Sequence, residues 1–238
     1  NKSFSSYLFG DYNDINSFSY LCGSAKNKSI EVNVNLQYTP KLLHCIYYRN
    51  FGPIEIKETN QWYFDELFPG NVCHHIMSLR WIKDIKNPSI KKEIIKSFIS
   101  YNQSPYQAKS KFYLGEQADH TTSIRLEILT NLIKEFDDDE ELVILIRYEL
   151  LKNIESCISD TYKKGNNHGL MVDKAVLDSI FTDEAIFSNA QHHISFLINR
   201  VKCQLDSIFD ENGFCKEHSI SYQEYNLGIA FDLISVMK

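Results

Sequence analysis

The feature that most constrains the fold is a spacing of four between apolar residues, which recurs from about residue 70 onward. Ile124, Ile128, Leu132 and Phe136 follow this spacing, and a second set continues it between residues 140 and 161. Because residues four apart lie on one face of an α-helix, each set predicts a helix with one buried face. The second set consists of Leu142, Ile146, Leu150, Ile154 and Ile158.

Capping and breaking residues set the ends of the predicted helices. Asn87-Pro88 places an N-cap residue before a proline at the first helical position, and Ser104-Pro105 ends that helix. Thr182 is the predicted cap of a later helix. The predicted helices cover about 71–85, 88–103, 119–136, 140–161, 168–181, 183–208 and 221–238.

Helices separated by short loops are typical of helical hairpins packed side by side, so we predict a mainly α domain over residues 61–238. Residues 1–60 are predicted to be an irregular segment packed on that domain. Polar and apolar residues alternate over Ser29–Leu36, which predicts a short strand, whereas Leu42–Tyr48 fits either a strand or a helix.

Composition narrows the classes of function. The net charge of -6 argues against a general nucleic-acid binder, which carries a basic face. The sequence has no apolar run long enough to span a membrane. Its six cysteines are scattered without a C-x-x-C pair, so we interpret them mostly as free thiols. The chain begins without Met and ends inside a helical pattern, as a processed or truncated chain would, so the compartment stays open.

Two polar loops carry the candidate chemistry. In the first, the Asn167 amide both donates and accepts hydrogen bonds, and the His168 imidazole exchanges protons near neutral pH. At a helix start, backbone N–H groups also point toward an anion, so a carboxylate could be bound and deprotonated there. In the second loop, the Tyr222 phenol suits protonation of a leaving alkoxide. The alternative is that Asn167 is an N-cap, His168 an ordinary first-turn residue and Tyr222 a packing residue.

Further candidates lie on the predicted helices. His120 and Arg125 are near the start of one of them, and Arg125 could clamp a carboxylate with two parallel N–H bonds or form a structural ion pair. His74-His75 and His192-His193 are adjacent pairs whose rings point to different faces of a helix. We therefore predict no metal site and no cofactor in this chain.

The two loops together resemble the helical N-terminal domain of heparinase II/III-like proteins, which group with the alginate-lyase-like polysaccharide lyases. The family pattern is roughly N-N-H-G, a helical hairpin, and then D-G-x-x-x-E-x-S-x-x-Y-H. Asn166–Gly169 match the first part, and Phe209–Asn226 match the second, except that Gln223 replaces the frequent His. Ser78–Ile82 also resembles the family's early helix with arginine and tryptophan. The resemblance covers about 60–238.

The resemblance implies an incomplete (α/α) toroid, with a C-terminal β-sandwich domain that is absent from this chain. It also implies β-elimination at a uronic acid unit of an anionic polysaccharide or oligosaccharide. Asn167 would neutralise the C6 carboxylate, His168 would neutralise it or act as the base, and Tyr222 would be the general acid. A periplasmic or secreted location follows from the resemblance, and a cytoplasmic one stays open. The predicted substrate-binding residues are Glu217, Arg125, His120 and Trp81.

Two other functions stay open from the sequence. A non-catalytic helical domain could bind a glycan or a protein in a groove lined by Trp62, Trp81 and tyrosines. A glycoside hydrolase would need two opposed carboxylates, for which Glu217 could be paired with Glu224 or Asp173.

Overall fold

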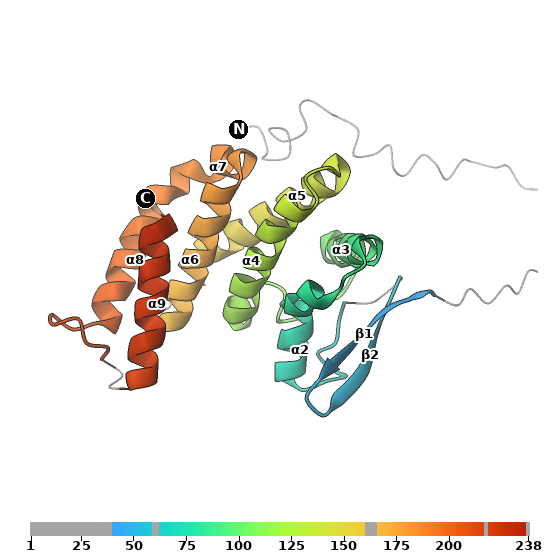
Figure 1. Ribbon diagram of the computed structural model, residues 1–238, viewed down its shortest axis with the longest axis horizontal. Helices are drawn as coiled ribbons and strands as arrows, with labels where there is room; N and C mark the ends of the chain where they lie inside the picture. The colour runs from blue at the N-terminus through green and yellow to red at the C-terminus, as the bar shows by residue number, and fades with distance from the viewer. Residues whose placement is uncertain (1–39, 59–61, 160–165, 217–218, 237–238) are drawn as a thin grey trace, which may run out of the picture. The chain divides into compact units, whose positions relative to one another are not determined.

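The computed structural model describes residues 40–58, 62–159, 166–216 and 219–236, which are mainly helical with one short two-stranded sheet (Figure 1). The predicted strand Ser29–Leu36 lies outside the described residues. Pro40–Lys238 form one compact unit, so the hairpin belongs with the helices. The elements are β1 Leu42–Tyr48, β2 Phe51–Lys57, α2 Gly70–Met77, η2 Arg80–Asp84, α3 Pro88–Gln103, η3 Glu116–Ala118, α4 Asp119–Glu135, α5 Glu140–Ile158, α6 Asn167–Thr182, α7 Glu184–Ala190, η5 Gln191–His193, α8 Ile194–Ile208 and α9 Ile220–Val236.

The apolar run that could have been strand or helix is the strand β1. It pairs with β2 in an antiparallel hairpin in which Ile46 lies opposite Ile54, and both side chains are buried. The His44 ring stacks on Trp81 with 5.6 Å between ring centroids. The hairpin thereby covers the aromatic core that follows α2, because strand side chains alternate between the two faces.

The middle helices begin where their capping residues predict. The Asn87 side chain accepts hydrogen bonds from the backbone N–H groups of Ser89 and Ile90 at 3.0 and 3.3 Å, before Pro88 opens α3. These bonds satisfy two N–H groups that have no partner within the helix. The apolar stripe predicted for α5 is buried at Leu142, Ile146, Leu150 and Ile154.

Helices α4 and α6 pack against each other in parallel. Three side-chain pairs join them at 2.8 to 3.2 Å, and the residue numbers rise together along both helices. Their first turns therefore lie at the same end of the molecule (Figure 1). The pairs are Asp119 with His168, Glu127 with Lys174, and Thr130 with Ser179.

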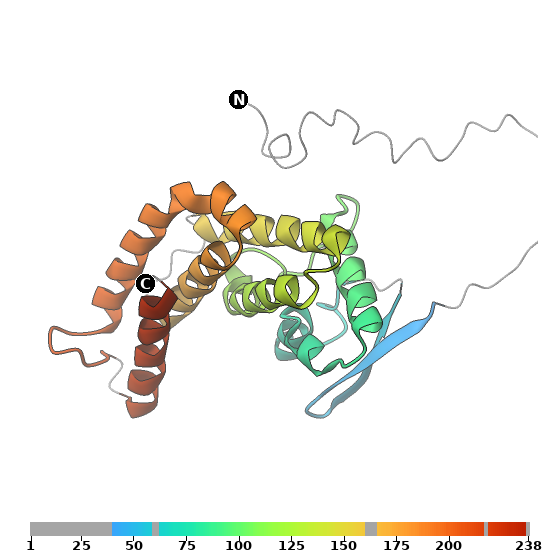
Figure 2. The same ribbon diagram turned by 45° about the horizontal axis from the view of Figure 1, so that its top comes forward.

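Helix α9 continues this row on the other side of α6. The Tyr225 hydroxyl lies 2.7 Å from Met171 Sδ, one turn from the start of each helix. Figures 1 and 2 show α4, α6 and α9 side by side. In the sequence, α5 connects α4 to α6, and α8 precedes α9. The row brings the first turns of three helices close together. No helix in the described part of the chain combines the length and apolar composition needed to cross a bilayer.

Two predicted helices are interrupted. The helix expected over 71–85 ends at Met77, because Leu79 has a left-handed backbone with a φ of 58° that an α-helix cannot include. The helix expected over 183–208 is divided into α7 and α8 by the short η5. Its cap is Asp183 rather than Thr182. The Asp183 carboxylate accepts from the Ile186 N–H at 3.0 Å, and a charged acceptor is favoured at a helix start.

Candidate histidine site

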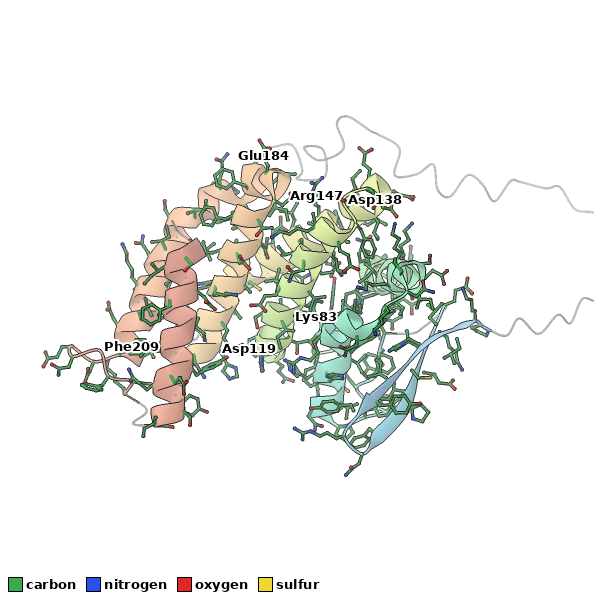
Figure 3. The ribbon with its side chains drawn as sticks, viewed as in Figure 1. Lys83, Asp119, Asp138, Arg147, Glu184 and Phe209 are labelled. Atoms are coloured by element: carbon green, nitrogen blue, oxygen red, sulfur yellow. The ribbon has the colours of Figure 1, made fainter. Side chains whose placement is uncertain are left out.

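Three histidine rings from separate parts of the sequence form a chain where α2 ends and where α4 and α6 begin. The His74 and His120 ring centroids are 4.7 Å apart, and those of His120 and His168 are 5.7 Å apart. Figure 3 places Asp119 at this end of α4. The structure thus brings together two predicted site residues, His120 and His168, and adds His74 to them.

His168 is held by a carboxylate. Its Nδ1 lies 3.2 Å from Asp119 Oδ2, and the other Asp119 oxygen accepts from the His120 backbone N–H at 2.6 Å. The His168 side chain is 45% exposed, whereas that of Asp119 is only 10% exposed. A buried carboxylate at one ring nitrogen orients an imidazole and fixes its tautomer. Asp119, which precedes His120 directly, was not predicted as a site residue.

The start of α6 is capped one residue earlier than we considered from the sequence. The Asn166 side chain accepts from the N–H groups of His168 and Gly169 at 3.1 and 3.3 Å. Asn167 is therefore the first helical residue, and its side-chain oxygen lies 3.0 Å from the His168 nitrogen. The Asn167 side chain is half-buried, and its amide accepts from the backbone N–H of His168.

The two more buried rings, His74 and His120, are kept neutral. Burial, followed by the charges of His120 and Arg80, lowers the pKa of His74 to about 4. Burial, followed by the effect of His168, also lowers the pKa of His120. The His74 Nδ1 atom lies 2.6 Å from the Thr121 hydroxyl. These rings can thus form hydrogen bonds at neutral pH without adding positive charge.

Arg80 supplies a cation to the site, a role that was not predicted from the sequence. Arg80 is exposed at the first position of η2, and its charge acts on His74 and His120. The preceding Leu79 is buried, so the turn directs one side chain to the core and the next to solvent. The sequence signal for this position is the likeness of Ser78–Ile82 to the lyase family's early arginine helix.

Of the two roles considered for Arg125, the structure does not support the substrate carboxylate clamp. Its side chain is 0% exposed, and its Nη1 donates to the Met77 carbonyl at 2.9 Å. Its Nη2 donates to Asn153 Oδ1 at 2.8 Å and to the Tyr113 carbonyl. Because this guanidinium is fully buried and bonded within the core, Arg125 is a structural residue.

The tryptophans are also core residues, contrary to the predicted role of Trp81 in substrate binding. Trp81 is 4% exposed and donates from Nε1 to the Ile76 carbonyl at 3.1 Å. Trp62 is 0% exposed and stacks on Trp81 with 6.5 Å between ring centroids. Neither ring can line a glycan-binding groove.

Tyr222 lies in the first turn of α9, and its side chain is 45% exposed. It is on the helix next to His168, but within the described residues no contact joins the two side chains. Glu217 lies outside the described residues. Gln223 faces the preceding loop, where it accepts from the Cys215 N–H and donates to the Gly213 carbonyl at 3.1 Å. Its amide therefore supports the loop before α9.

The geometry gives less support to a hydrolase site or a metal site. Asp173 is 0% exposed and bonded to Arg200, so it cannot serve as a hydrolase carboxylate. Among the residues that the structure describes, no group of His, Cys, Asp or Glu side chains is arranged to hold a metal ion. No family model, curated protein or solved structure matches the chain, so the side-chain chemistry carries the functional argument.

We expect His74 to make the fold sensitive to acid. Its pKa is about 4 in the folded chain, against an ordinary value of 6.5. The unfolded chain takes up this proton first as the pH falls, so stability decreases between pH 6.5 and about 4. His74→Gln should therefore lose about 1 to 2 kcal/mol less stability than the unmodified chain between neutral and acid pH. The effect is limited to this size because the ring is only partly buried.

Urea unfolding at neutral pH and near pH 4 measures this effect as the difference in stability between the two conditions. His192→Gln, which changes an exposed ring on η5, is the control and should keep the acid sensitivity of the unmodified chain. If His74→Gln lost as much stability in acid as the unmodified chain, a different group would be responsible.

Proposed function

We propose that this chain acts on a uronic acid unit of an anionic polysaccharide or oligosaccharide by β-elimination. The observation that carries the proposal is the half-exposed His168 imidazole, which is oriented by the buried Asp119 carboxylate and lies next to His120, a ring on which the charge of the exposed Arg80 acts. Such a site combines a proton acceptor with a cation, which is the pair of groups that removal of a proton next to a carboxylate requires.

In the proposed reaction, Arg80 and Asn167 neutralise the C6 carboxylate of the sugar, which makes the C5 proton more acidic. His168 removes that proton and becomes an imidazolium that Asp119 stabilises. The C5 electron pair forms a double bond to C4 as the C4–O4 bond breaks, and Tyr222 donates a proton to the departing O4. The product carries a C4–C5 double bond at its new non-reducing end.

We also propose that the helices form an incomplete (α/α) toroid, and their arrangement supports this. In such a fold, the inner helices run parallel to each other and the outer helices return the chain. The parallel row of α4, α6 and α9, with α5 and α8 between its members, has this alternation. It would place His168 and Tyr222 on neighbouring inner helices, where one sugar unit could reach both.

The test is formation of an unsaturated product, followed by its ultraviolet absorbance, with a panel of uronate polymers. Tyr222→Phe removes the proton donor and keeps the ring, so we expect kcat/KM to fall by about 10²-fold or more. Tyr47→Phe, on an exposed tyrosine of β1, should have no effect. Unchanged turnover by Tyr222→Phe would exclude the role as general acid, and no product from any polymer would exclude the lyase.

A further inference from the structure

Arg125 connects the segments that present the histidine site, although its own side chain is buried. From α4, its Nη1 donates to the Met77 carbonyl at the end of α2 at 2.9 Å. Its Nε and Nη2 donate to Asn153 Oδ1 of α5 at 3.1 and 2.8 Å. A single guanidinium therefore ties the end of α2 to α4 and α5.

The turn that follows Met77 carries Arg80. Its two intervening residues, Ser78 and Leu79, are both 0% exposed, and Leu79 has the left-handed φ of 58°. A branched side chain keeps this conformation only where the surrounding structure holds it. Because so short a segment separates the Met77 carbonyl from Arg80, the position of that carbonyl determines where Arg80 leaves the core.

We infer that Arg125 is a positioning residue, which holds the turn between α2 and η2 through the Met77 carbonyl and so fixes Arg80 beside His74 and His120. A guanidinium is needed because its donors point in several fixed directions and reach Met77 and Asn153 together. The single nitrogen of a lysine cannot span both. The effect on catalysis rests on the proposed function, whereas the effect on the turn does not.

Hydrogen exchange tests the structural part. In the turn, the Ile82 N–H donates to the Leu79 carbonyl at 2.9 Å. We expect Arg125→Lys to speed amide exchange over 78–85 about tenfold relative to Leu177→Ala, a buried change on α6, compared at equal global stability. Equal exchange in the two variants would overturn the inference.

A double-mutant cycle tests the catalytic part. If Arg125 acts through Arg80, Arg125→Lys alone lowers kcat/KM about tenfold but has no further effect in the Arg80→Gln background. Independent, additive losses would overturn the inference, and so would full activity of Arg125→Lys. A chain that makes no unsaturated product refutes the proposed function alone, because the exchange comparison needs no activity.

Discussion

Replacing His168 with glutamine is expected to lower kcat/KM on a uronate polymer by about 10²- to 10⁴-fold, the range for loss of a general base. Glutamine keeps a polar side chain of similar reach but cannot accept the C5 proton at neutral pH. Initial rates of ultraviolet absorbance measure the loss. Thermal unfolding should be nearly unchanged, since the ring is 45% exposed and does not fill the core.

Two further variants sharpen this test. His192→Gln replaces an exposed imidazole on η5 and should keep full activity. Asp119→Asn keeps the shape of the residue that orients the ring but removes its charge. We expect it to lower kcat/KM, because the amide no longer holds the ring in the orientation and tautomer that the carboxylate fixes. Turnover by His168→Gln at the unmodified rate would exclude His168 as the base.

Replacing Arg200 with methionine is expected to lower the free energy of unfolding by about 3 to 5 kcal/mol, because it leaves a buried carboxylate without its cation. Arg200 Nε donates to the two Asp173 oxygens at 3.0 and 2.9 Å, and Asp173 is 0% exposed. Gln204 Nε2 donates to the same carboxylate at 2.8 Å but carries no charge. Urea unfolding measures the change.

An exposed ion pair provides the matched control for Arg200→Met. Lys41 and Glu93 are 3.1 Å apart with exposed fractions of 59% and 43%, so Lys41→Met should cost at most about 1 kcal/mol. Combining Arg200→Met with Asp173→Leu should recover part of the stability, since no charge then stays buried alone. A cost for Arg200→Met as small as that of Lys41→Met would contradict the burial argument.

Local signals in the sequence predicted most helices but not their interruptions. The start of α3 follows from Asn87-Pro88, because a cap satisfies N–H groups within the next residues. The break at Leu79 has no such signal. Leucine favours a helix, and the left-handed backbone of Leu79 occurs where its side chain is fully buried.

In the candidate site, too, some residues had a local sequence signal and others did not. His168 was predicted because an imidazole at a helix start suits proton transfer, and His120 was predicted as a substrate-binding residue near the start of another helix. The sequence left Arg125 open between a carboxylate clamp and a structural ion pair, because helical spacing gives a residue's face without showing what packs on that face. α2, α5 and α6 all pack on α4, so even a charged residue there is buried.

The sequence by itself determined the helices and most of their ends, because hydrogen bonds between residues four apart and side-chain caps are local interactions. Only the tertiary structure decided that His74, His120 and His168 form one cluster, and that Arg80 rather than Arg125 is exposed beside it. These positions depend on parallel packing of α4 against α6 and on a strained turn after α2. Contacts between residues far apart in the chain produce both features.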